Sequence, residues 1–195
     1  MIAALSARGL PTGAASSCAY DTATATAQVQ MLSPRTVIRR AGNRILVDGR
    51  ACAPLAGTRR IVVASAFPPA ADTVVVDESH GRLADRRAAD RPEVVALTGT
   101  GGDTMEVIGT PGSDRYVAHD ALGASIDLGG DPEPDFVSTD VGHIVLFGRG
   151  GDDRLLASSG PGDRVSVPVE LHGGPGRDVL RGGRSGNDLL DGGQP

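Results

Sequence analysis

The chain has 195 residues, with 24 acidic and 19 basic side chains, 28 glycines, no tryptophan and only 3% aromatic residues. No apolar run approaches the roughly 20 residues that a membrane-spanning helix needs. The net charge of −5 argues against a protein that binds nucleic acid by neutralising phosphates. We therefore expect neither a membrane span nor a nucleic-acid partner.

Residues 1–17 come first and are rich in small side chains, as the segment before a signal cleavage site is. Their only apolar run is Ile2 to Leu5, whereas a secretory signal needs about 7–15 apolar residues. We expect either a signal-peptide remnant or a disordered tail.

The two cysteines, Cys18 and Cys52, are an even number in a chain of extracellular-looking composition. This favours one disulfide that closes a 33-residue loop. The alternative is a pair of unrelated buried thiols. A zinc site is not expected, because the cysteines and the four scattered histidines show no ligand spacing.

Residues 18–95 predict an N-terminal β-region, because short β-branched runs alternate with turn dipeptides such as Asp48-Gly49. The expected strands are 27–32, 36–39, 45–47, 61–63 and 74–76. Residues 82–89 have a helix-like composition, but their charge and the following Pro92 predict an exposed excursion.

Residues 96–195 differ from the first part in charge and glycine content. The first hundred residues carry a net charge of +4 and 7 glycines, and the remainder carry −9 and 21. Expected strands at 105–108, 116–118, 124–128, 144–147 and 165–169 alternate with Gly-Asp turns. With so few aromatic residues, a stacked all-β solenoid fits better than a single thick core.

A nine-residue pattern, G-G-x-G-x-D-x-U-x with U a large apolar residue, recurs in this second part. Residues 173–181 match every fixed position, and residues 182–191 match with one inserted residue. Partial matches lie at 98–106, 109–117 and 148–156. The candidate site residues from these units are Gly173, Gly174, Gly176, Asp178, Gly182, Gly183, Gly186, Asp188, Gly148, Gly151, Asp153, Gly109, Gly112, Asp114 and Asp103.

The pattern resembles the hemolysin-type calcium-binding repeat of RTX proteins. The resemblance implies a right-handed parallel β-helix or β-roll, with Ca²⁺ held between stacked turns. It covers about residues 96–195, continuous with the preceding β-region, which is similar to the Cys-anchored segment ahead of such repeats in some secreted bacterial proteins. It also implies a secreted, extracellular protein.

The chemistry of the frame agrees with this resemblance. Glycine permits positive φ and leaves carbonyls free, and Asp adds a carboxylate, while Ca²⁺ takes 6–8 oxygens at about 2.3–2.6 Å. The family model favours Asp178 and Asp188 as ligands, with carbonyls from Gly173, Gly174, Gly182 and Gly183. Asp153, Asp114 and Asp103 come next. The apolar residues two positions after these aspartates predict an inward column of Met105, Tyr116, Leu155, Leu180 and Leu190.

The spacing of the aspartates departs from a strict repeat of nine. Asp153 and Asp178 are 25 residues apart, as are Asp163 and Asp188. This interval suits one full turn of a larger β-helix with longer rungs.

We expect calcium binding rather than catalysis, since the chain has no nucleophile elbow, HExxH, P-loop or spaced carboxylate pair. Because the second part is acidic and poor in apolar residues, it should fold only when Ca²⁺ neutralises its carboxylates. The alternative is a metal-free β-solenoid that serves as a surface spacer or adhesive module for an unidentified protein or surface partner.

Overall fold

The computed structural model describes residues 15–66, 70–83, 92–119, 124–128, 134–160 and 163–194. Residues 1–14 of the predicted tail and residues 84–89 of the excursion lie outside these ranges. Ser17, which was expected to end that tail, is instead the first residue of a strand, Ser17–Asp21. The described residues form strands and turns and no helix. The all-β prediction is therefore confirmed.

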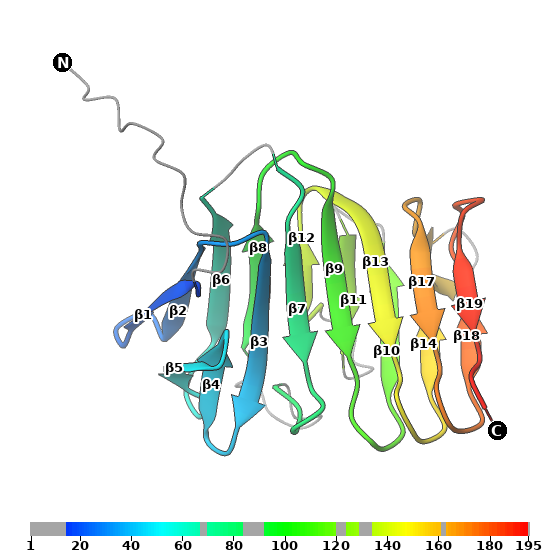
Figure 1. The fold of residues 1–195 in the computed structure, drawn as a ribbon, viewed down its shortest axis with the longest axis horizontal. Helices are drawn as coiled ribbons and strands as arrows, with labels where there is room; N and C mark the ends of the chain where they lie inside the picture. Colours follow the sequence, from blue (N-terminus) through cyan, green and yellow to red (C-terminus); the bar gives the residue numbers. More distant parts are fainter. Residues whose placement is uncertain are drawn as a thin grey trace.

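Most strands belong to two large sheets (Figure 1). The nine-stranded sheet has the order β1-β2-β6-β8-β12-β11-β10-β14-β18. Its strands are β1 (Ser17–Asp21), β2 (Thr26–Met31), β6 (Arg60–Ser65), β8 (Glu93–Leu97), β12 (Phe136–Ser138), β11 (Ala124–Asp127), β10 (Arg115–His119), β14 (Arg154–Leu156) and β18 (Val179–Arg181).

The second large sheet has eight strands in the order β19-β17-β13-β9-β7-β3-β4-β5. These are β19 (Leu189–Asp191), β17 (Val169–His172), β13 (Val141–Phe147), β9 (Asp103–Ile108), β7 (Thr73–Asp77), β3 (Arg35–Ala41), β4 (Arg44–Val47) and β5 (Arg50–Pro54). A small third sheet pairs β15 (Ser158–Gly160) with β16 (Asp163–Arg164).

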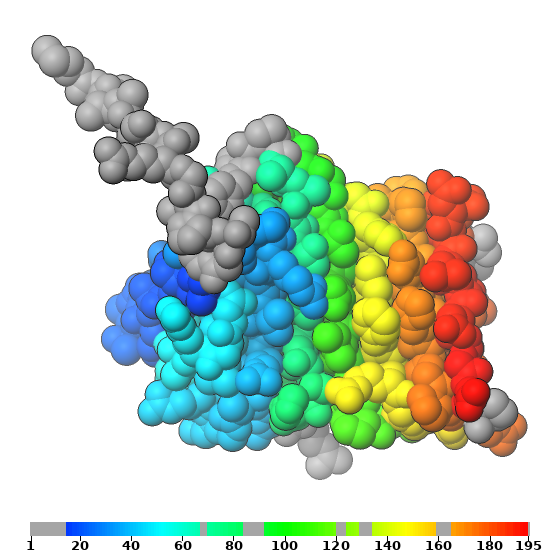
Figure 2. Space-filling model, viewed as in Figure 1, coloured from blue at the N-terminus to red at the C-terminus, as the bar shows by residue number. Residues whose placement is uncertain are grey.

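From β6 onward the chain passes back and forth between the two large sheets, except that β10, β11 and β12 follow one another within the nine-stranded sheet. The strands β7, β9, β13, β17 and β19 pair in parallel within the eight-stranded sheet, and β10, β14 and β18 do so within the other. Successive parts of the chain consequently form bands along the long axis of the molecule (Figure 2).

The sheets are mixed, whereas a wholly parallel coil was expected. Antiparallel pairs join β1 to β2, β3 to β4, β4 to β5, β10 to β11 and β11 to β12. The turn between β4 and β5 shows why: Asp48 and Gly49 have φ values of 48° and 78°. Two successive positive φ values make a tight hairpin, which returns the chain within its own sheet.

The strand predictions were largely confirmed, with one clear error. The runs around 27–32, 36–39, 45–47, 61–63 and 74–76 all lie in strands. The predicted strand at 165–169 was wrong, because β17 begins only at Val169. Pro168 lacks an N–H for the ladder, so the strand starts after it.

Side chains that face between the two large sheets form the core. Met105, Tyr116 and Leu155 are almost fully buried, as predicted, and Tyr116 aligns with Leu155 and Leu180 across three parallel strands. Leu190 was expected in this column but is 44% exposed. It lies on β19, the edge strand of its sheet, where no further described strand covers it.

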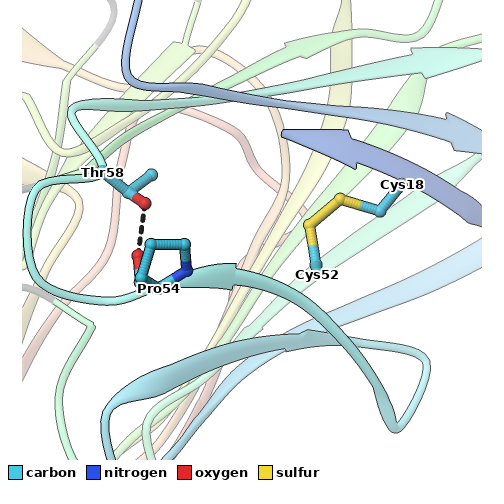
Figure 3. Close-up of a disulfide and its surroundings, with 4 residues drawn as sticks. All are labelled: Cys18, Cys52, Pro54 and Thr58. Atoms are coloured by element: carbon cyan, nitrogen blue, oxygen red, sulfur yellow. Dashed lines mark hydrogen bonds between the residues drawn. A yellow bond between two sulfur atoms is a disulfide. The ribbon is translucent and has the colours of Figure 1, made fainter. Parts of the chain in front are cut away.

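The predicted disulfide is confirmed: Cys18 and Cys52 are bonded, with Cα atoms 5.5 Å apart (Figure 3). Cys18 lies on β1 and Cys52 on β5, which are edge strands of the two different large sheets. Just after β5, the Thr58 hydroxyl donates a hydrogen bond to the Pro54 carbonyl (Figure 3). The disulfide thus links both sheets at their N-terminal end.

Candidate metal site

Three turns of similar sequence stack at the lower edge of the molecule in Figure 1. Residues 109–114, 148–153 and 173–178 each lead from the eight-stranded sheet to the nine-stranded sheet. Each begins with glycine and ends with aspartate. We call these the lower turns, and we call the turns that lead back at the opposite edge, including 98–102 and 182–188, the upper turns.

The final aspartates of the lower turns form a continuous hydrogen-bonded stack, the Asp column (Asp114, Asp153 and Asp178). The backbone N–H of Asp114 donates to Oδ1 of Asp153 over 2.7 Å, and that of Asp153 donates to Oδ1 of Asp178 over 2.9 Å. Asp153 and Asp178, which are 25 residues apart, therefore occupy equivalent places in adjacent lower turns. One carboxylate oxygen of each of these two residues is therefore occupied.

The second carboxylate oxygens distinguish the members of the column. Oδ2 of Asp153 and Oδ2 of Asp178 are buried and have no hydrogen-bond partner. In contrast, Oδ2 of Asp114 accepts hydrogen bonds from the Thr110 N–H over 2.6 Å and the Thr110 hydroxyl over 3.0 Å. Two of the three carboxylates thus have a free, inward oxygen.

The backbone at the second residue of each turn accounts for this difference. Arg149 and Gly174 have φ values of 77° and 96°, whereas Thr110 has no such positive φ. In these two turns, the N–H of the second residue consequently does not donate to the aspartate as the Thr110 N–H donates to Asp114.

The glycines of the lower turns bring main-chain oxygens toward the free carboxylate oxygens. A Cβ on Gly148 would overlap Oδ2 of Asp153 and would lie 2.7 Å from the Gly173 carbonyl oxygen. A Cβ on Gly173 would overlap Oδ2 of Asp178. Carboxylate and carbonyl oxygens are the ligands that Ca²⁺ prefers, and here they converge between adjacent turns.

The remaining motif glycines of the lower turns allow this close stacking. A Cβ on Gly176 would overlap the Gly151 carbonyl, and a Cβ on Gly151 would lie 2.6 Å from the carbonyl carbon of Gly112. A Cβ on Gly109 would lie 2.6 Å from the Gly148 carbonyl oxygen. Only glycine permits the turns to approach so closely.

Burial disfavours the negative charge of Asp153, the middle member of the column. Burial raises the pKa of Asp153 to about 6, and the negative charges of Asp114, Asp178 and Asp152 add to this, while the hydrogen bond from the Asp114 N–H opposes it. A bound cation would relieve both the desolvation and the repulsion.

Arg82 already supplies a cation at one end of the column. Its guanidinium pairs with Oδ1 of Asp114 and also donates to the Ser113 carbonyl over 3.2 Å. Arg82 could not be predicted as part of this site from the sequence, because it lies 32 residues before Asp114 and outside every repeat unit. Asp114 is thereby neutralised within the protein.

The aspartates Asp103 and Asp188 lie at the opposite edge. Asp188 accepts hydrogen bonds from the Gly183 N–H over 2.8 Å and the Val169 N–H over 3.3 Å. With Gly182, Gly183 and Gly186 it belongs to an upper turn, so Asp178 and Asp188 are not neighbours. Each repeat unit contains one strand, and a strand carries the chain from one edge to the other. The Asp163 side chain lies outside the described residues.

Among the described residues, no group of three or more His, Cys, Asp or Glu side chains is arranged to hold a metal ion. A cation in the lower turns would therefore be held by two carboxylates together with main-chain carbonyls. In the described part of the chain, no helix is long and apolar enough to span a membrane. Comparisons with protein-family models, curated proteins and solved structures found no match.

Proposed function

We propose that this protein binds Ca²⁺ between the lower turns 148–153 and 173–178. The observation that carries the proposal is the pair of buried, unpartnered oxygens, Oδ2 of Asp153 and Oδ2 of Asp178. A buried polar group without a partner costs about 1–3 kcal/mol, and more when charged. Two such atoms at equivalent positions of adjacent turns favour a common missing ligand.

The ligand chemistry favours a hard divalent cation. The available donors are carboxylate oxygens and the Gly173 carbonyl, which lies near Gly148. A soft metal would require thiolate or imidazole ligands. Mg²⁺ demands a small, nearly ideal octahedron, whereas Ca²⁺ accepts irregular sets of oxygens. Stacked turns of unequal sequence suit Ca²⁺ better.

Three further elements belong to this proposal. The return of the chain between two sheets through Gly-Asp turns supports a right-handed, RTX-like β-roll arrangement of residues 96–195. The disulfide supports a secreted, extracellular protein, because disulfides persist in oxidising compartments. The role is binding without catalysis, and Ca²⁺ drives the folding of the acidic second part.

The test is a Ca²⁺ titration of the chelator-stripped protein, followed by far-ultraviolet circular dichroism and calorimetry, with Mg²⁺ as a control ion. We expect a Ca²⁺-specific gain of β signal that is lost in the D153N/D178N double variant. Asp191→Asn is the matched control, because its side chain is 64% exposed and lies outside the lower turns. Asp188→Asn reports whether the upper turn contributes.

Equal calcium responses in the double variant and the wild type would contradict the proposed ligands. A wild-type spectrum and heat signal indifferent to Ca²⁺ would favour the alternative, a metal-free β-structure that acts as a surface spacer or adhesive module. The Arg82–Asp114 pair shows how such a turn can be neutralised without metal.

A further inference from the structure

A second pair of aspartates lies at the upper edge, far from the Asp column. Asp72 immediately precedes β7, and Asp103 begins the neighbouring parallel strand β9. Asp72 is 1% exposed and Asp103 is 2% exposed. The pattern G-G-x-G-x-D does not include Asp72, which follows two alanines.

The pair repeats the hydrogen-bonding geometry of the Asp column. The backbone N–H of Asp72 donates to Oδ1 of Asp103 over 2.9 Å, and the Asp72 carbonyl accepts from the Thr104 N–H over 2.8 Å. In the column, Asp114 donates to Asp153 and accepts from Arg154 in the same way. Oδ2 of Asp103 is held by the buried Thr98 hydroxyl.

The Asp72 carboxyl has no such support. Neither of its oxygens makes a hydrogen bond of normal geometry, and both are buried. Burial raises the pKa of Asp72 and the Asp103 charge adds to this, while the nearby Ser65 hydroxyl acts in the opposite direction. No described basic side chain pairs with either aspartate. Two adjacent buried carboxyls require either a proton or a cation.

Further oxygens lie beside the turn that precedes Asp103. A Cβ on Gly101 would overlap the Ala70 carbonyl, so the turn before Asp103 lies against the backbone before Asp72. Asp140 reaches the same turn, where its carboxylate accepts from the Gly102 N–H over 3.2 Å. Carboxylates and carbonyls in this arrangement favour a hard cation.

We infer that the upper edge holds a second divalent-cation site, selective for Ca²⁺, in which the unpartnered Asp72 carboxylate is the ligand and the adjacent Asp103 carboxylate adds negative charge. This site shares no residue with the lower turns. Either site can be present without the other.

The experiment counts the Ca²⁺ bound per chain by calorimetry in four forms of the full chain: wild type, D72N, D153N/D178N and the combined triple variant. We expect D72N to bind about one Ca²⁺ fewer than the wild type, and D153N/D178N to retain a site that the triple variant lacks. Asp77→Asn is the matched control, because Asp77 lies on the same strand, β7, and caps Ser79 locally.

Asparagine has nearly the shape of a protonated aspartic acid, so the D72N variant distinguishes a neutral acid from a cation ligand. If Asp72 is only a neutral acid, D72N keeps the wild-type stoichiometry, and this result overturns the inference. The D153N/D178N variant leaves Asp72 unchanged, so it tests the site even if D72N does not fold. Equal binding by D153N/D178N and the triple variant also overturns it. Complete loss of Ca²⁺ binding in D153N/D178N overturns it as well, because that variant keeps both Asp72 and Asp103.

Discussion

At the scale of single residues, one motif position produces different chemistry in different turns. Asp114, Asp153 and Asp178 occupy the same place in three stacked turns, yet only Asp114 has a cation and a full set of hydrogen bonds. The repeat pattern located all three aspartates. It could not separate them, because Arg82 and the φ value of the second turn residue come from long-range packing.

Glu78 is fully buried and gives a prediction about pH. It accepts hydrogen bonds from the Leu83 N–H over 3.0 Å and the Tyr116 hydroxyl over 3.1 Å. Burial raises its pKa to about 7, although Tyr116, Arg82 and the Leu83 N–H oppose the shift and Asp114 adds to it. The protonated form is therefore favoured in the folded state.

The sign of the effect follows from linkage. The contribution of Glu78 to stability is fully present below its unfolded pKa of about 4.3 and is lost as the pH rises through about 7. We expect this group alone to lower the free energy of unfolding by up to about 3 kcal/mol between pH 4 and pH 8. In thermal melts at a fixed Ca²⁺ concentration, Glu78→Gln should remove that part of the pH dependence.

The control for this experiment is Glu93→Gln, since Glu93 is partly exposed and paired with Arg60 on the surface. That variant should keep the wild-type pH profile. The same steep loss of stability in Glu78→Gln would show that another group titrates.

At the scale of elements, the turns depend on glycines that no side chain can replace. Gly174 has a φ of +96°, and a Cβ there would overlap the Arg149 carbonyl of the preceding lower turn. We expect Gly174→Ala to destabilise the protein by about 1–3 kcal/mol through backbone strain and the steric clash. Chemical denaturation measures this cost.

Gly192 provides the matched control, because its added Cβ would meet nothing within 4 Å and its φ is not positive. Gly192→Ala should remain within about 0.5 kcal/mol of the wild type. Similar losses in the two variants would show that the tight stacking of the lower turns does not limit stability.

The strands show how far the sequence predicts the elements. Short β-branched runs correctly predicted β6 and β7, because such runs are typical of buried strands. The sequence did not reveal which strands pair. The antiparallel β11 and β12 lie between β8 and β10 in the sheet, although the chain reaches them only after β10. Such pairing depends on contacts between distant segments, which local patterns do not encode.

At the scale of the whole molecule, the disulfide joins the two sheets where both have edge strands. The pairing of Cys18 with Cys52 could be predicted from two cysteines alone, but its position between β1 and β5 could not. A bond that closes a loop of this length stabilises a protein by about 3–4 kcal/mol in the chain-entropy model.

We therefore expect the Cys18→Ala/Cys52→Ala variant to lose about 3–4 kcal/mol of unfolding free energy. A thiol reductant should lower the melting temperature of the wild type to the value of the variant and leave the variant unchanged. A reductant that lowers both melting temperatures equally would indicate an effect other than cleavage of this disulfide.

Because the covalent link lies at one end, we expect local stability to decrease along the long axis away from the disulfide. Strands β18 and β19 are the opposite edge strands of the two large sheets, and Val179, Leu189 and Leu190 on them are 44–49% exposed. In stacked structures each layer is stabilised mainly by its neighbours. Amide protons near the disulfide should thus exchange most slowly with solvent, and the amide protons of β18 and β19 should exchange most rapidly. A single melting temperature would average over layers of different local stability.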